Sequence, residues 1–426
     1  MTNSGRLEAL MQTTTADAVY HHDTLPCGIE YAVRPLPGRH VVSMEIRVLA
    51  GMSEEPPDRL GLAHILEDTI TKGTERRDAR ALSDAFDAIG ASRGGGAGLE
   101  TTTFTCTVLP EFFQQAVALH AEFLRTPTFP QDMLDVAIEL TRQEHLALQD
   151  DAQELADKYL SRQVYGPVLG RHTLGEPETI GNITRGAVVG QWEKFFAAGR
   201  VQVSVAGAVE PARVAAALER EFAGFGAAAR AGREHYRAEF SARTTHYDKQ
   251  LEQEQIGIAF PGVYVTAADY PTQRVVIGIL AGGMSARLFT EVREKQGLVY
   301  WVSAWQETPR GAGMIFLGAS TTPERCDRTH HTLLREIDRL TEDLDQEELE
   351  RTLAGIEAST RTRGYTTRAL CAELADDLFH RGRPMPTDEK LALLRAVTID
   401  DVKAFLAAHP RDRLSVVTLG PKALSE

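Results

Sequence analysis

The chain runs twice through a similar order of strands and helices, and this repetition constrains its fold more than any other feature of the sequence. In the first half, alternating or β-branched apolar runs bounded by Pro or Gly predict strands. They lie at residues 28–34, 41–48, 101–109 and 201–207. The second half repeats the pattern at residues 254–261, 299–305, 312–319 and 413–420. Strands with intervening helices in this order favour a duplicated unit whose sheet is covered by helices.

Helical spacing of apolar residues fills most of the stretches between the strands. The predicted helices lie at residues 60–72, 79–89, 111–125, 131–163, 286–295, 324–341, 346–362 and 368–379. We therefore predict an α+β fold with two homologous sandwich-like domains, each a mainly antiparallel sheet with packed helices. A stretch rich in Ala, Gly, Arg and Glu separates the halves. The expected division is an N-terminal domain (1–225), a linker (226–245) and a C-terminal domain (246–426).

The charge and the cysteines narrow the class of protein. The formal charge of −14 argues against nucleic acid as a partner, because phosphate binding needs clustered Lys and Arg. No apolar run reaches the roughly 18 to 20 residues that cross a bilayer, and the N-terminal stretch lacks a secretory pattern. The cysteines are far apart and form no CxxC pair, which is typical of reduced thiols. These features predict a cytoplasmic protein without a membrane partner.

The strongest local signal for chemistry lies on the predicted helix at 60–72. Positions i, i+3 and i+4 share one face of a helix, so His64, Glu67 and Asp68 project together. A zinc hydrolase needs such a grouping, because ligands one turn apart hold the metal while a carboxylate deprotonates the bound water. A hydrogen-bonded histidine beside two solvated acids explains the same residues, and the helix alone leaves both interpretations open.

The wider context of this helix resembles a known family. Residues 62–68 and 71–75 (LAHILED and TKGTE) are similar to the inverted zinc helix of the pitrilysin/insulinase-like zinc peptidases. The overall length is nearest to the short bacterial branch related to the mitochondrial processing peptidase. The resemblance implies that His64 is a zinc ligand and Glu67 the general base. It also implies a peptide substrate and a dimer, with a homologous subunit or a second copy, that encloses a chamber.

The sequence departs from the family pattern at two positions of the implied metal site. The second zinc-ligating His of the family is Asp68 in this chain. The third implied ligand is Glu144, which follows Asp68 by 76 residues, the spacing found in the family. A further family Glu, seven residues earlier, is Ala137. A carboxylate on the shorter Asp side chain does not reach where an imidazole nitrogen would lie, so we predict weakened zinc binding by His64, Asp68 and Glu144.

The longest match to the family lies in the second half, at residues 280–300 (LAGGMSARLFTEVREKQGLVY). In the family, an Arg and a Tyr seven residues apart in this block hold substrate carbonyls and stabilise the developing oxyanion. The resemblance assigns these roles to Arg293 and Tyr300. From the residues alone, an ion pair between Arg293 and Glu294 and a tyrosine packed within a strand remain the simpler interpretation.

Three functions follow from this pattern. The chain is expected to be the partner subunit of a heterodimeric zinc endopeptidase, supplying Arg293 and Tyr300 while Zn²⁺ is held in the complex. Alternatively, it is itself an active metallopeptidase, in which a homodimer stays possible. A third hypothesis is a non-catalytic scaffold that adds a bound peptide to a sheet edge. For this edge the resemblance indicates the strand at 101–106, with Thr101, Thr102 and Thr103 contacting the substrate.

Overall fold

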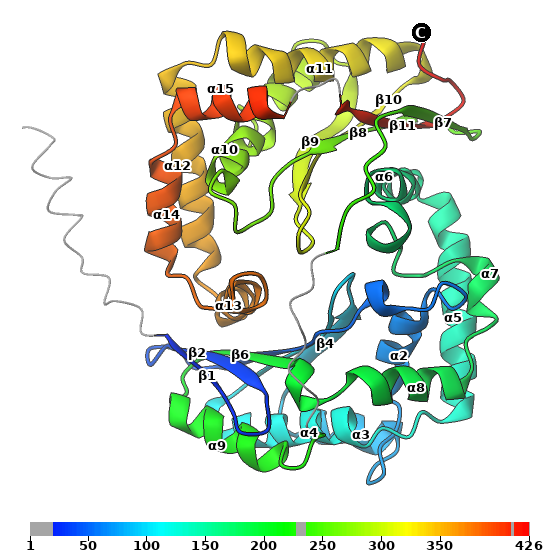
Figure 1. Ribbon diagram of the computed structural model, residues 1–426, viewed down its shortest axis with the longest axis vertical. Helices are drawn as coiled ribbons and strands as arrows, with labels where there is room; N and C mark the ends of the chain where they lie inside the picture. Colours follow the sequence, from blue (N-terminus) through cyan, green and yellow to red (C-terminus); the bar gives the residue numbers. More distant parts are fainter. Residues whose placement is uncertain (1–19, 227–235, 410–412, 426) are drawn as a thin grey trace, which may run out of the picture.

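The computed structural model describes residues 20–226, 236–409 and 413–425, and within them the chain forms two sheets (Figure 1). The first sheet has the strand order β1-β2-β6-β3-β5-β4 and is antiparallel except for the β2–β6 pair. Its strands are β1 (His21–Thr24), β2 (Glu30–Pro35), β3 (Val42–Val48), β4 (Ser92–Ala97), β5 (Thr102–Val108) and β6 (Val201–Gly207). This arrangement confirms the predicted α+β class for the first half.

The second sheet has the strand order β7-β11-β8-β10-β9, with β7 and β11 parallel and the other pairs antiparallel. Its strands are β7 (Thr244–Asp248), β8 (Glu254–Pro261), β9 (Val299–Glu307), β10 (Met314–Thr321) and β11 (Ser415–Gly420). Both sheets therefore combine one parallel pair with antiparallel neighbours, as expected of a duplicated unit. Residues 227–235 of the predicted linker lie outside the described residues.

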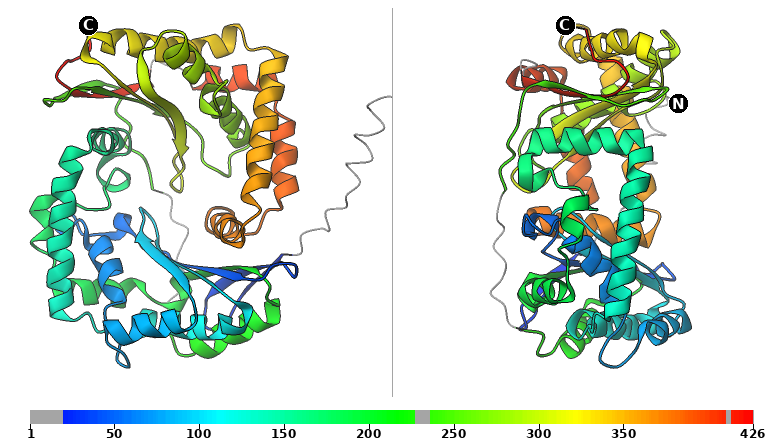
Figure 2. Two further views of the ribbon diagram at one scale, coloured as in Figure 1. Left: turned by 180° about the vertical axis from the view of Figure 1, so that it is seen from behind. Right: turned by 90° about the vertical axis from the view of Figure 1, so that its right-hand side faces the viewer.

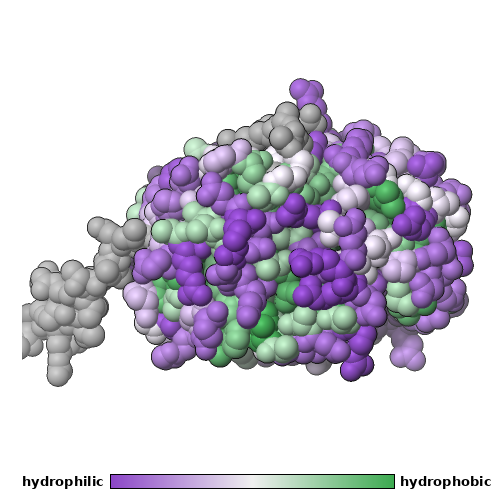
Figure 3. Space-filling view, turned by 90° about the horizontal axis from the view of Figure 1, so that it is seen from below, coloured by the Kyte–Doolittle hydropathy of each residue, from purple (hydrophilic) through white to green (hydrophobic). Residues whose placement is uncertain are grey.

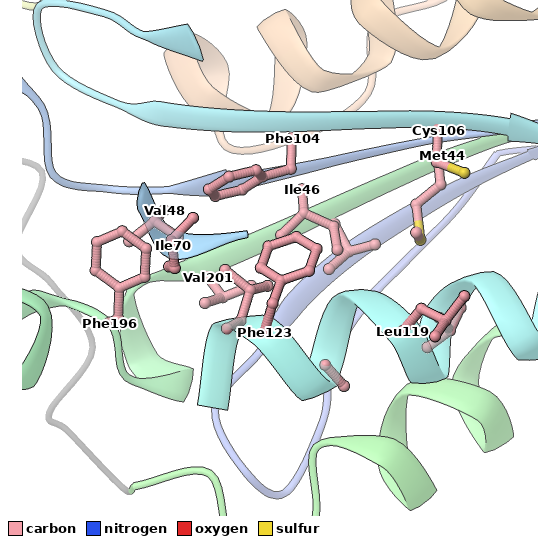
Figure 4. Packing of buried hydrophobic residues seen from close by; sticks show 14 of the residues in the cluster. Met44, Ile46, Val48, Ile70, Phe104, Cys106, Leu119, Phe123, Phe196 and Val201 are labelled. Carbon is pink, nitrogen blue, oxygen red and sulfur yellow. The ribbon is translucent and has the colours of Figure 1, made fainter. Parts of the chain in front are cut away.

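Helices of each half cover one face of its own sheet (Figures 1 and 2). In the first half these are α2 (Leu62–Ile70), α3 (Ala79–Ala88), α4 (Phe113–Arg125), α8 (Arg185–Phe195) and α9 (Pro211–Glu221). Figure 4 shows the resulting core, in which Ile46 of β3 and Phe104 of β5 face Phe123 of α4. In the second half they include α10 (Tyr270–Ala281), α11 (Cys326–Glu342) and α15 (Ile399–Ala408).

The opposite face of each sheet is covered by a helix from the other half. Helix α13 (Thr367–Arg381) packs on β2, β3 and β6, while α6 (Ala152–Leu169) packs on β8 and β11 (Figure 1). The two-residue period of β3 explains this division, because Met44, Ile46 and Val48 enter the N-terminal core while the alternate residues face α13. Among these, Ser43 Oγ lies 2.9 Å from Thr367 Oγ1.

The remaining helices connect these layers. They are α5 (Gln131–Asp150), α7 (Pro177–Ile180), α12 (Gln346–Arg363) and α14 (Thr387–Arg395). The helix predicted at 131–163 is in fact two helices, because Asp151 adopts an extended conformation (φ −91, ψ 92). Its carboxylate accepts a hydrogen bond from the Glu154 N–H and thereby caps α6. This break turns the chain from the N-terminal half towards the C-terminal sheet.

The outer surface of the N-terminal half is largely polar. Figure 3 shows mainly hydrophilic residues on the face seen from below, with hydrophobic residues interspersed among them. Isolated surface hydrophobic residues of this kind are normal for folded proteins. Among the described residues, no helix is both long and apolar enough to span a bilayer.

Candidate functional site

Helix α2 presents the predicted acidic and histidine side chains because its other face is buried. Its buried apolar residues are Leu62, Ala63, Ile65, Leu66 and Ile70. The helix begins after Gly61, whose φ of 96° suits only glycine without strain. There the Glu55 carboxylate accepts hydrogen bonds from the backbone N–H groups of Gly61 (3.1 Å) and Ala63 (2.7 Å). These bonds satisfy N–H groups that the first turn leaves without helical partners, and so fix where the helix starts.

The structure brings His64, Asp68 and Glu144 together. His64 Nε2 lies 3.1 Å from Glu144 Oε2, which reaches it from α5, and 3.7 Å from Asp68 Oδ2 one turn further along α2. The His64 side chain is 15% exposed, whereas those of Asp68 and Glu144 are 36% and 49% exposed. The imidazole is therefore held between two carboxylates that remain open to solvent.

Glu67 points from the same helix towards the edge of the first sheet. A Cβ atom at Gly95 of β4 would lie only 2.2 Å from Glu67 Oε1, so a larger residue there would displace the Glu67 carboxylate from its present position. Burial raises the pKa of Glu67 to about 7, and the nearby charge of Asp68 contributes in the same direction. A carboxyl group with a pKa near neutrality is suited to taking up and releasing a proton.

The residues present do not fit a zinc ion. Within the described residues, no group of three or more His, Cys, Asp or Glu side chains is arranged to hold a metal. The one imidazole of the cluster is already in hydrogen-bond contact with Glu144, and Asp68 replaces the second imidazole. Ala137, at the position of the further family Glu, is 4% exposed and belongs to the hydrophobic core. The cluster therefore consists of a histidine that is hydrogen-bonded to Glu144 and a second carboxylate, that of Asp68, 3.7 Å from the imidazole.

Arg293 and Tyr300 form a second cluster in the other half. Arg293 lies in a short π-helix, Phe289–Glu294, and Tyr300 lies near the start of β9. The guanidinium lies 5.2 Å from the centre of the Tyr300 ring and 4.8 Å from that of Phe289. Such distances are typical of cation–π contacts, which hold the two side chains in a fixed relation.

Neither side chain of this pair is buried or strongly paired with an acid. The nearest carboxylate, that of Glu294, lies 4.0 Å from Arg293 Nε, at the outer limit of an ion pair. Tyr300 is 79% exposed, so its ring does not pack within the strand. Of the simpler interpretation, the Arg293–Glu294 ion pair is present at the limiting distance of 4.0 Å, whereas the tyrosine is not packed within the strand. The hydrogen-bond donors of both side chains are available to a ligand.

The prediction that the strand at residues 101–106 forms an edge of the sheet was wrong. Strand β5, which carries Thr102 and Thr103, is paired on both sides, with β3 and with β4, and Thr101 precedes it. The Thr102 hydroxyl is buried and donates to the Ala50 carbonyl (2.9 Å). The glycine-rich stretch before it forms a strand of its own, β4, which pairs with β5 in antiparallel register. The exposed edge beside the α2 cluster is therefore β4.

Comparisons with known proteins agree with this geometry. Residues 31–177 match the model of the insulinase peptidase family M16, and residues 182–356 match the M16 inactive domain. The chain is 27% identical to an uncharacterized zinc protease of Streptomyces coelicolor over 427 residues, covering 98% of this chain and 93% of that protein. It is 22% identical to a probable mitochondrial-processing peptidase subunit beta of Arabidopsis thaliana, covering 93% and 78%.

Among solved structures, a peptidase M16 inactive domain from Pseudomonas fluorescens has a similar fold. The two superpose with a TM-score of 0.87 at 21% identity, covering 96% of this chain and 99% of the other. This similarity extends over both halves.

Proposed function

This chain belongs to the insulinase-like M16 peptidase family, and we propose that it acts there as the partner subunit of a zinc-dependent peptide-processing endopeptidase. In this role it contributes Arg293 and Tyr300 to an active site whose metal is held by a homologous companion chain. The homologous relatives are named zinc proteases, which supports zinc at the level of the family.

One observation carries the proposal: Tyr300 is exposed and the Arg293 side chain is 39% exposed, whereas the single imidazole of the α2 cluster is already hydrogen-bonded to Glu144. Hydrolysis of a peptide by a metal-activated water needs a metal site, which the described residues of this chain do not provide. Stabilising the developing oxyanion needs only hydrogen-bond donors fixed in place beforehand. The Arg293 guanidinium and the Tyr300 hydroxyl are such donors.

The proposed substrate is an unfolded or short peptide in an extended conformation. Strand β4 ends the first sheet, and the residues Ser92–Gly96 are exposed. An extended peptide adds to such an edge through backbone hydrogen bonds that do not depend on its sequence. In the companion chain, the same edge would align the peptide with the metal. In this chain, it lies beside Glu67 and supports peptide binding without cleavage.

The test is co-expression with a homologous chain of the same organism that carries the complete His-x-x-Glu-His helix. We expect cleavage of a fluorogenic peptide by the complex, and no cleavage by this chain alone. Two further results would redirect the assignment. Stoichiometric metal and full activity in this chain alone, both lost with Glu67→Gln, would make it an active peptidase with His64, Asp68 and Glu144 as ligands. Peptide binding without cleavage, even with the companion, would make it a scaffold.

A further inference from the structure

A cavity in the C-terminal half is lined by charged residues that play no part in the site described above. Its volume is about 840 Å³, and its lining residues come mainly from α10, α12, α13, α14 and β9. Four cationic side chains line it, namely Arg274, Arg363, Arg381 and Lys390, together with the acids Glu373, Asp376 and Asp377. His380 also lines it and is uncharged near neutral pH, because burial lowers its pKa to about 4.

The acids of this cavity are already bound to cations. Lys390 Nζ lies 2.7 Å from both Glu373 Oε1 and Asp377 Oδ2. Asp376 Oδ1 lies 2.7 Å from a guanidinium nitrogen of Arg47, which reaches it from β3 of the other half. Each negative charge in the lining is thus used within the protein.

Arg274 and Arg363 differ from the other cations, because neither side chain forms an ion pair or hydrogen bond with any described residue. Arg274 is partly buried on α10, and burial together with the charges of Arg363 and Arg381 lowers its pKa. A partly buried guanidinium without a counter-ion is unfavourable, and an anion within reach of both arginines would remove that penalty.

The apolar part of the cavity lining indicates that the anionic group belongs to a larger, partly apolar ligand. Ile277 and Ala281 of α10 and Leu393 and Leu394 of α14 supply an apolar wall, and Leu393 remains 47% exposed. Cavities that bind small ligands are typically about 300–1,000 Å³ and combine apolar walls with a few polar groups. The volume is larger than a free phosphate or carboxylate ion would fill.

Tyr270 adds a polar group to the same wall. Tyr270 lines the cavity, as does Gln306, whose Nε2 donates a hydrogen bond to the Tyr270 hydroxyl at 2.8 Å. Since that bond uses an oxygen lone pair, the hydroxyl proton remains available for donation to a ligand.

We propose that this cavity binds a small ligand with an oxyanion group, a carboxylate or a phosphate, held by Arg274 and Arg363. Tyr270 donates a further hydrogen bond to it, and the apolar body of the ligand packs against α10 and α14. Planar guanidinium groups suit this role, because they donate two parallel hydrogen bonds to a carboxylate or phosphate. The proposal does not depend on the metal cluster or on the peptidase role.

The experiment measures binding to the purified full chain by calorimetry and thermal shift. The probes are N-acetyl-trileucine with a free carboxylate, its C-terminal amide, and octyl phosphate. We expect at least one anionic probe to bind, and the amide to bind at least 10-fold more weakly than the free acid where the acid binds. Binding of the acid alone identifies a carboxylate as the ligand group, and binding of octyl phosphate alone identifies a phosphate.

Variants locate the binding. Arg274→Gln should lower the affinity for the anionic probe by roughly 10-fold or more. Arg363→Gln should lower it by a smaller factor, because Arg363 is exposed. Arg361→Gln is the matched control, since Arg361 lies on α12 like Arg363 but its Nε donates a hydrogen bond to Glu357 at 2.9 Å. Arg274→Lys keeps the charge and serves if the Gln variant fails to fold. Absence of binding by both anions, equal affinity for acid and amide, or unchanged affinity in the Arg274 variants would overturn the proposal.

Discussion

The candidate site residues of the two halves differ in their exposure to solvent and in their hydrogen bonding. On α2, His64 is held within 3.1 Å of Glu144 and 3.7 Å of Asp68. At the start of β9, Tyr300 is 79% exposed, and Arg293 lies over its ring with the Glu294 carboxylate 4.0 Å away. The His64 imidazole must give up its hydrogen bond to Glu144 before it binds anything else. The Arg293 guanidinium and the Tyr300 hydroxyl need no such rearrangement, and this difference is the basis of the proposed division of roles between the halves.

The comparison depends on the halves being fixed to each other, and a buried ion pair contributes to that. Arg310 follows β9, and its Nε lies 2.8 Å from Glu100, which precedes β5; their side chains are 9% and 6% exposed. Replacing Glu100 with Ala leaves the Arg310 charge buried without a partner, which should cost about 3–5 kcal/mol. Chemical denaturation measures this loss. Glu111→Ala, an acid in the short turn before α4, is the control, and equal stability of both variants would contradict the expectation.

Substitution of Arg293 and Tyr300 tests the proposed substrate-binding role of the C-terminal half. In the complex with a metal-bearing companion, Arg293→Ala and Tyr300→Phe should each lower kcat/KM by about 10²–10³-fold, because each removes a donor to the oxyanion. The metal content should not change. Arg328→Ala is a control, since Arg328 is exposed and its side chain bonds only Gln296 among the described residues. Variants with full activity would show that the pair does not touch the substrate.

His120, a buried histidine of the N-terminal half outside the α2 cluster, makes the free energy of unfolding depend on pH. His120 is buried, its Nδ1 lies 2.7 Å from the Ala116 carbonyl oxygen, and burial lowers its pKa to about 4. The unfolded chain takes up a proton near pH 6.5, whereas the folded chain does so only near pH 4. Stability is therefore full above pH 6.5 and falls as the pH drops towards 4, by at most about 3 kcal/mol.

His120→Phe should remove this pH dependence, because a phenyl ring keeps the packing against Phe86 and Phe123 and does not titrate. Urea denaturation between pH 7 and pH 4 measures the effect in both proteins. His331→Phe is a control on an exposed histidine. The same slope in the native protein and in His120→Phe would show that other groups dominate the acid response.

Local patterns predicted most of the elements but not their partners. The apolar period of residues 201–207 is enough to indicate a strand, and β6 has those bounds. The spacing of His64, Glu67 and Asp68 placed them on one face of α2 because helix geometry is local. By contrast, the exchange of α6 and α13 between the sheets arises from packing between distant segments. Strand β4 is not predicted by the sequence because glycine has low strand propensity, and it forms through backbone pairing with β5.

The smallest expected effect is an increase in zinc affinity on substitution of Asp68 by His. Asp68 is 36% exposed at the side chain, so an imidazole is accommodated there without crowding the core. Asp68→His restores a second nitrogen ligand one turn from His64, with Glu144 still in reach, and should raise zinc affinity by at least about 10–100-fold. Competition with a chromophoric chelator measures this change, and Asp84→His on the exposed face of α3 is the control. Equal affinity in the native protein and in Asp68→His would mean that a carboxylate already serves as the ligand, and the contrast between the halves would then lie in the substrate and not in the metal.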